Sequence, residues 1–266
     1  MTIGNKGLED LRRAVGLLEN PSFISRVTDF AGQPIEKLIG FLPIQASGKI
    51  QDTVKTTLYK LLSLSVKTMD GNFDGPSSAI AHKIATGVSG AMGGAFGLPA
   101  LAFELPVSTS IILRSIADIA RSEGEDIASI ETRLACLEVF ALGGRSEADD
   151  GAETGYFAVR AALAKAVSDA AKHIAEKGLT QKGAPVIARF IALLASRFGA
   201  VISEKVAAQA VPVVGAIGGA TINLLFVGHF QDIARGHFIV RRLEREYGKE
   251  AVRKEYEKIR RGNRGL

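Results

Sequence analysis

Cysteine, tryptophan and aromatic residues in general are scarce in this sequence, and each scarcity excludes a class of protein. Cys136 is the single cysteine among 266 residues, which excludes a disulfide scaffold and a zinc site built on cysteines. Tryptophan is absent and aromatic residues make up 6%, so a base-stacking surface or a carbohydrate platform is not expected. The run GAMGGAFG has no Lys-Ser/Thr to hold phosphates, and no GxSxG motif occurs. Composition therefore gives no support to nucleophilic or nucleotide chemistry.

Strand patterns and a secretory signal are also missing. No run alternates β-branched and polar residues between hairpin turns. The first twenty residues are polar and lack the apolar core of a signal peptide. We therefore expect an intracellular protein, at the cytoplasmic side of the membrane, where one free cysteine stays reduced.

The apolar residues that are present recur with helical spacing. Residues 49–69 place Ile50, Val54 and Leu58 on one stripe. A further helix is expected from Glu125 to the glycine pair 143–144, and an alanine-rich helix ends at Gly178. The predicted class is all-α, a large helical bundle.

Two long uncharged stretches interrupt the amphipathic pattern. Residues 84–103 and 206–231 carry no charge, and both are rich in glycine. Their GxxxG spacings would let two helix backbones approach closely. Helices that are apolar all round must be buried, either at the centre of the bundle or in a bilayer. A third reading is a soluble form that hides them and a bound form that inserts them. The helix-packing glycines are Gly90, Gly93, Gly94, Gly97, Gly215 and Gly219.

The two stretches also resemble each other weakly. AMGGAFG (91–97) parallels AIGGATI (216–222), and each is followed about thirty residues later by a charged helix that ends on a glycine. This spacing indicates a pseudo-repeat around two central glycine-rich segments.

Positive charge is concentrated at the C-terminus. Residues 235–266 hold eleven Lys and Arg against five Asp and Glu, whereas residues 84–234 carry net negative charge. Such a tail could meet anionic lipid or nucleic acid, but its interleaved glutamates are equally typical of a solvated helix. Nucleic acid is not expected as a partner, because phosphate recognition would favour fewer acids on the same face. The candidate membrane-surface residues are Arg241, Arg242, Arg245, Arg253 and Lys254.

Four blocks carry a resemblance to a known family. The sequences ELPVSTSIILRSIADIARSEGEDI (104–127), LACLEVFALGG (134–144), ETGYFAVRAAL (153–163) and the run from Val211 to Gly248 resemble the EcsC family of bacterial proteins. The resemblance covers roughly residues 50–256. It implies an accessory of a transport or envelope system, because the family is named for a gene beside those of an ABC transporter, and it implies no catalytic residues. Glu104 stands where such proteins often have aspartate.

Polar residues in or beside the uncharged stretches are the candidate site. Arg114 and Asp118 are four residues apart and share a helix face with Glu104, so they could form an ion site or a structural ion pair. His229, Asp232 and His237 could bind a metal, or could be polar groups where an apolar helix reaches solvent. The candidate polar cluster also includes Tyr156, Arg160 and Asn223.

These observations predict a three-part chain and favour one function. We expect an N-terminal helical extension over residues 1–45, a helical domain over 46–250 and a basic tail over 251–266. The favoured function is a non-enzymatic, membrane-associated helical protein without cofactor or metal. Its partner would be a membrane surface or a membrane protein, such as an ABC transporter. The alternative is a soluble helical enzyme or ligand- or metal-binding protein with a pocket between the central helices.

Overall fold

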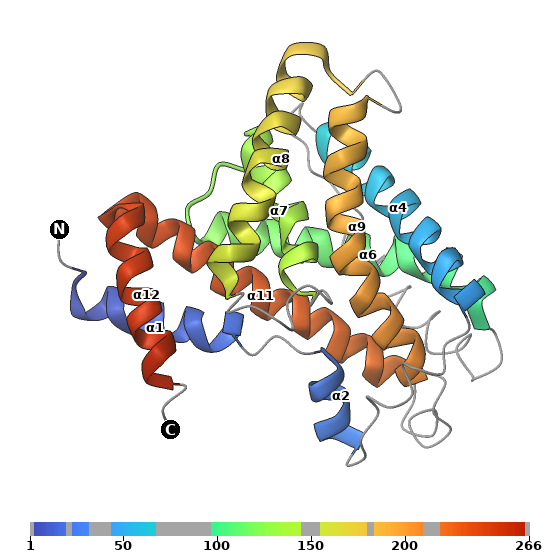
Figure 1. Cartoon of the computed structure of the whole chain (residues 1–266), viewed down its shortest axis with the longest axis horizontal. Coiled ribbons are helices and arrows are strands. Elements are labelled where there is room, and N and C mark those ends of the chain that lie inside the picture. Colours follow the sequence, from blue (N-terminus) through green and yellow to red (C-terminus); the bar gives the residue numbers. More distant parts are fainter. Residues whose placement is uncertain are drawn as a thin grey trace.

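The computed structural model describes residues 3–19, 23–31, 44–67, 97–144, 155–179, 184–209 and 219–263 (Figure 1). Those residues form helices and connecting turns without strands, so the all-α prediction is confirmed. The helices are α1 (Asn5–Glu19), α2 (Phe23–Ala31), α4 (Ile44–Lys67), α6 (Gly97–Ser122), α7 (Ile130–Leu142), α8 (Tyr156–Lys177), α9 (Pro185–Gln209), α11 (Gly219–Tyr247) and α12 (Lys249–Asn263).

Helix α11 is the axis of the molecule. Its 29 residues make it about 44 Å long at 1.5 Å per residue. It crosses the molecule from one end to the other and packs against α1, α2, α6, α7, α9 and α12 (Figure 1). The buried residues Phe226, Phe230, Ile233 and Phe238 recur at helical spacing, so its apolar stripe faces the core along most of its length.

Helix α7 is buried on every side. All residues from Thr132 to Leu142 are buried, and α4, α6, α8, α9 and α11 pack around the helix. The helix begins at Ile130 and not near Glu125, because the Ser129 side chain accepts a hydrogen bond from the Thr132 amide and caps the first turn. Its expected end at the glycine pair 143–144 is confirmed.

Aromatic rings lock α7, α9 and α11 together. The ring centroid of Phe140 lies 4.9 Å from that of Phe198 and 5.3 Å from that of Phe230. Phe226 lies edge-on to Phe230 at 5.1 Å. All four rings are fully buried, and together they form the centre of the core.

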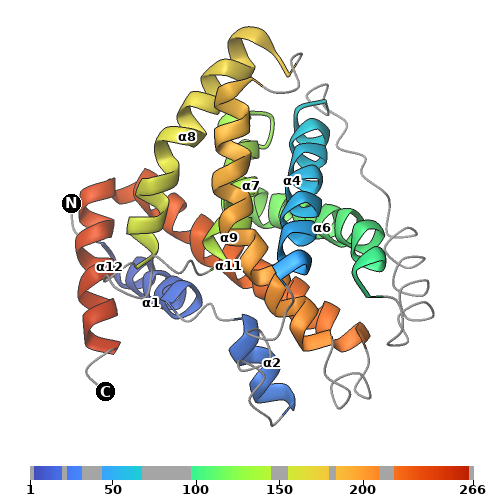
Figure 2. The same ribbon diagram turned by 45° about the vertical axis from the view of Figure 1, so that its right-hand side comes forward.

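Three helix ends meet at one corner of the molecule. The start of α6, the end of α9 and the start of α11 converge there in both views (Figures 1 and 2). We call the described residues 97–107, 205–209 and 219–226 the junction. The uncharged stretches enter it, but residues 84–96 and 210–218 lie outside the described residues.

The glycine predictions fall mainly on those undescribed residues. Gly90, Gly93, Gly94 and Gly215 lie outside the described residues, as do residues 91–96 of the first copy of the pseudo-repeat and residues 216–218 of the second. Gly97 and Gly219 are the first residues of α6 and α11. Close helix packing through these glycines therefore stays a prediction.

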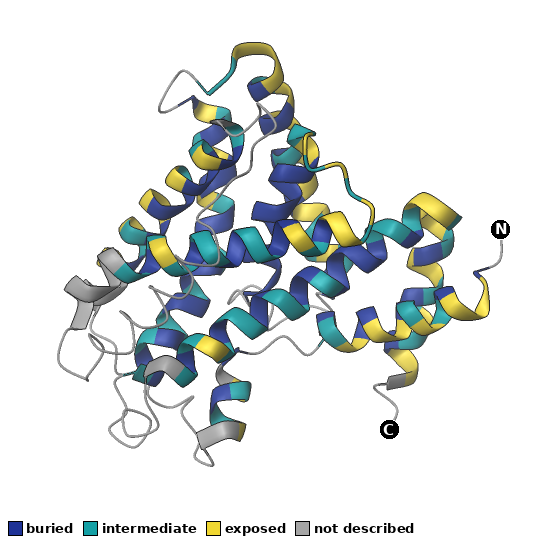
Figure 3. Ribbon diagram, turned by 180° about the vertical axis from the view of Figure 1, so that it is seen from behind, coloured by how far each residue is buried: buried dark blue, intermediate teal, exposed yellow. Residues whose placement is uncertain are grey.

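Both terminal helices pack at the other end of α11 (Figure 3). Helix α12 buries Val252, Tyr256 and Arg260 on one face and exposes charged residues on the other. Helix α1 buries Leu11, Val15 and Leu18 in the same core. The proposed division at residues 45 and 250 stays a prediction.

Candidate functional site

The junction contains a buried ion pair between the two charges that border the uncharged stretches. Glu104 follows the first stretch, and Lys205 precedes the second. The Lys205 ammonium donates to Glu104 Oε1 and lies 4.6 Å from the ring centroid of Phe226. The Lys205 side chain has no solvent exposure, and that of Glu104 is 11% exposed. The Lys205 ammonium therefore connects α9 to α6 through a salt bridge and to α11 through an aromatic ring. These contacts lie where the first stretch ends and the second begins.

The partner of Glu104 differs from the one expected from the sequence. Asp118 lies fourteen residues further along α6, about 21 Å away at 1.5 Å per residue. It is exposed and accepts a hydrogen bond from Arg121 at 3.0 Å. Arg114 lies half-buried between them. The three residues do not form one cluster, whereas the helix α9 supplies the cation beside Glu104. Asn223 is also in the junction, half-buried at the start of α11.

His229, Asp232 and His237 have separate partners. His229 is buried, and its Nε2 donates to the Gly143 carbonyl oxygen at 2.8 Å; burial lowers its pKa to about 4. Asp232 accepts from Arg26 at 2.8 Å and from Arg235 at 2.9 Å. No group of three or more His, Cys, Asp or Glu among the described residues could hold a metal ion.

His237 belongs to a second polar cluster, in which Tyr156 and Arg160 are also found. The Tyr156 hydroxyl lies 2.9 Å from His237 Nδ1, and both side chains are buried. Arg160 donates to the two carboxylate oxygens of Glu244 at 2.8 and 2.7 Å. The same guanidinium reaches the Tyr156 hydroxyl at 3.4 Å. Helices α8 and α11 are thereby joined by a bidentate ion pair.

Sequence reasoning missed the carboxylates of this region. Arg241 forms a bidentate pair with Glu125, with both distances at 2.8 Å. Glu138 lies on α7 and is buried among apolar residues. A single charge within the apolar run LACLEVFAL was the signal available for Glu138. Glu125 and Glu244 gave no local signal, because their partners lie far away in the sequence.

Three of the five candidate membrane-surface residues are paired within the molecule. Arg241 and Arg245 both contact Glu125. Arg242 donates to Glu123 at 2.7 Å and to Asp10 at 2.8 Å. The acidic turn after α6 thus neutralises much of the basic end of α11.

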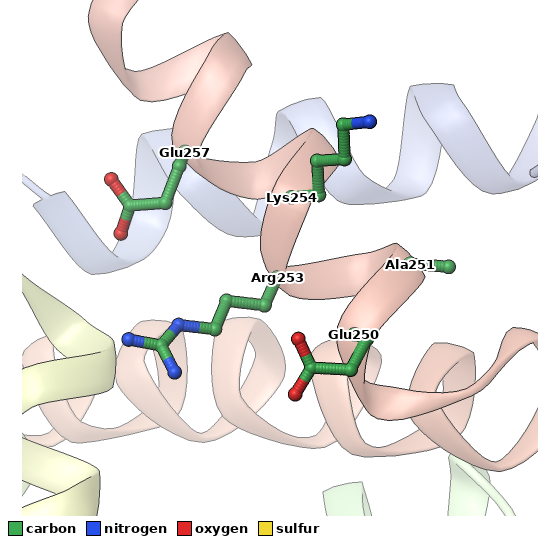
Figure 4. A pocket seen from close by; sticks show the side chains of 5 residues that line it. All are labelled: Glu250, Ala251, Arg253, Lys254 and Glu257. Carbon is green, nitrogen blue, oxygen red and sulfur yellow. The ribbon is translucent and has the colours of Figure 1, made fainter.

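The remaining two residues are exposed on α12. Arg253 and Lys254 border a shallow open depression of about 490 Å³, together with Glu250, Ala251 and Glu257 (Figure 4). The Arg253 guanidinium carbon lies 5.9 Å from the ring centroid of Phe157. A depression bordered by alternating charges offers no enclosed binding space.

Within the described part of the chain, α9 has the length and composition to cross a membrane. Its most apolar window has a mean hydropathy of 1.7, and half of that window is buried inside the molecule. The aromatic contacts of Phe198 place this helix in the core. Such a helix is weak evidence of membrane association, because central helices of soluble bundles have the same composition.

The fold and the site define an all-helical bundle organised around one long helix and two buried polar clusters. The model of the EcsC protein family matches residues 14–243. The chain belongs to the EcsC protein family. No curated protein and no solved structure matches it.

Proposed function

We propose that this EcsC protein is a non-enzymatic membrane-associated protein that contacts the bilayer through the junction. It would work at the cytoplasmic side, as an accessory of a transport or envelope system or beside a membrane protein such as an ABC transporter. The observation that supports this most strongly is that the described ends of the two uncharged stretches meet at one corner, beside the Glu104–Lys205 pair.

Two exposed apolar side chains at the junction support its role as a contact surface. Leu224, in the first turns of α11, is 72% exposed, and Val107, one turn after Glu104, is 38% exposed. A single exposed leucine is ordinary on a protein surface, so Leu224 supports the proposal only because it lies beside the ends of two uncharged stretches. Leu64, 44% exposed, lies instead toward the far end of α4.

The basic residues of α12 limit the orientations in which the molecule can bind a bilayer. Arg253 and Lys254 lie on α12, at the end of α11 opposite to the junction (Figure 2). A flat bilayer reaches both regions only when α11 runs along its surface, because the two are separated by most of the length of α11, which is about 44 Å. Anionic headgroups would then contact α12 while the junction contacts the acyl chains.

Vesicle flotation tests the proposal. We expect the wild-type protein to float with vesicles that contain anionic lipid. Leu224→Ser should reduce the bound fraction several-fold without changing the unfolding transition. Leu64→Ser is the matched control, because it removes an exposed leucine near the C-terminal end of α4, outside the junction. It should leave vesicle binding unchanged. A wild-type protein that stays at the bottom of the gradient with every vesicle composition contradicts the proposal.

A further inference from the structure

Glu138 is a buried carboxyl group that is not paired with either nearby arginine. It lies on α7, where every residue from Thr132 to Leu142 is buried, and its Oε1 receives no hydrogen bond from the described residues. A buried carboxylate normally accepts several hydrogen bonds or pairs with a cation. The position of Glu138 therefore needs a chemical explanation.

Both arginines that act on Glu138 donate to other carboxylates. Arg160 donates to both oxygens of Glu244, and Arg241 donates to both oxygens of Glu125. Within each of these two bidentate pairs, the positive charge of the arginine cancels the negative charge of the glutamate. An ionised Glu138 would add one buried negative charge to a balanced set, whereas a protonated Glu138 leaves the set neutral.

The other polar groups around α7 do not supply the missing charge. On α11, His237 is buried; burial and the charges of Arg160 and Arg241 lower its pKa well below the ordinary value, so it stays neutral. On α8, Tyr156 bonds to His237. Arg245 also contacts Glu125, but its side chain is 43% exposed, so its charge is largely screened by solvent.

The elements on the remaining sides of α7 have their own partners. On α9, Arg197 donates to the carbonyl oxygens of Ala141 and Gly144. On α7 itself, Arg133 donates to the carbonyl oxygens of Ile127 and of Ser65 on α4. The electrostatic field at Glu138 therefore comes from Arg160, Arg241 and Glu244. The Cys136 thiol on the same helix does not contribute, because burial raises its pKa and it is uncharged.

We propose that Glu138 is a proton-binding site that joins α7 to the polar faces of α8 and α11. The bound proton keeps the five-residue set of Glu125, Glu138, Arg160, Arg241 and Glu244 electrically neutral, and its loss places an excess negative charge between the three helices. Burial raises the pKa of Glu138 from 4.5 to about 7, with the two arginines opposing the shift. Packing of the three helices thereby depends on pH near neutrality.

The sign of the effect follows from linkage. Since the pKa is raised in the folded state, the folded protein binds this proton more tightly than the unfolded chain, and Glu138 favours folding at low pH. This contribution decreases as the pH rises and is lost once the pH has passed through about 7.

Infrared spectroscopy and chemical unfolding test the proposal. We expect the wild-type protein to show a protonated carboxyl C=O band at about pH 6 that disappears with a midpoint near neutral pH. The band should be missing in Glu138→Gln. It should remain in Glu131→Gln, the matched control, because Glu131 is exposed on the same helix. Relative to Glu138→Gln, the folding constant of the wild type should fall about tenfold between about pH 6 and about pH 8.5.

Two results would overturn the proposal. One is a wild-type spectrum without a carboxyl band that titrates near neutral pH. The other is a band that persists in Glu138→Gln. If that variant does not fold, the infrared titration of the wild-type protein still decides, because presence of the titrating band supports the site and its absence refutes it.

Discussion

Lys205 and Glu104 are 101 positions apart in the sequence, and their side chains form a buried salt bridge. Each residue marks the edge of one uncharged stretch. The contact therefore places residues 97–103 of the first stretch and 206–209 of the second at the same corner of the bundle, a relationship that neither stretch reveals alone. It also makes the ion pair a structural element, since a fully buried ammonium needs a counter-charge.

Removing either partner should destabilise the protein by different amounts. Glu104→Gln leaves the ammonium of Lys205 buried without a counter-charge and should cost about 3–5 kcal/mol of unfolding free energy. Lys205→Met should cost less, because the Glu104 carboxylate keeps some access to water. The double variant should recover part of the loss. Urea unfolding measures all three. The control is Lys172→Met, since the Lys172–Glu176 pair is exposed on α8 and should change stability by less than about 0.5 kcal/mol.

Acid should destabilise the protein through His229. Burial lowers the pKa of this residue to about 4 in the folded state, so it is neutral there, while the unfolded chain titrates near 6.5. The stabilisation is present above about pH 6.5 and is lost as the pH falls toward about 4. His229→Gln keeps an N–H donor for the Gly143 carbonyl and should remove about 2 kcal/mol of the loss between about pH 7 and about pH 4.5.

The control for that titration is His173→Gln on α8. It replaces a half-buried histidine and controls for the removal of an imidazole as such. Equal pH profiles for wild type and His229→Gln would contradict the assignment.

Two glycines should respond oppositely to alanine. At Gly144 an added Cβ would lie 2.2 Å from the backbone oxygen of Arg197, so Gly144→Ala should force α7 and α9 apart and cost about 1–3 kcal/mol. At Gly228 nothing lies within 4 Å of the added atom, so Gly228→Ala should stabilise α11 by about 0.5–1 kcal/mol. Thermal unfolding of the two variants compares them; a stabilised Gly144→Ala protein would show that the two helices pack differently.

The basic residues of α11 and α12 should separate into two groups. Arg242→Gln breaks contacts with Glu123 and Asp10 and should lower unfolding free energy by about 1–3 kcal/mol. Arg253→Gln and Lys254→Gln remove exposed charges and should leave stability within about 0.5 kcal/mol. The latter two should each weaken binding to anionic vesicles by about 1 kcal/mol, as measured by salt-dependent co-sedimentation. Unchanged vesicle binding in the double variant would exclude α12 from the membrane surface.

Local patterns predicted the parts of this structure that depend on local forces. The periodicity of residues 49–69 and the glycines after α7 and α8 indicated helices and their ends correctly. The start of α7 was misplaced, because Ser129 and the preceding turn were not recognised as a cap.

The long-range polar contacts could not be predicted in this way. Arg241 was a candidate for lipid contact, but it pairs with Glu125, 116 residues away. Glu104 was grouped with residues on its own helix, whereas its partner is on α9. Sequence gives the charge of such residues but not which helix faces them, and that choice depends on the packing of the whole bundle.

Contact between the junction and a bilayer can be measured at residue 224. An environment-sensitive fluorophore would be attached at Leu224→Cys in a Cys136→Ser background, with Leu64→Cys as the matched position. On addition of anionic vesicles, we expect a blue-shifted emission and protection from an aqueous quencher at residue 224, and no change at residue 64. Equal quenching at residue 224 with and without vesicles would contradict the claim that the junction faces the bilayer.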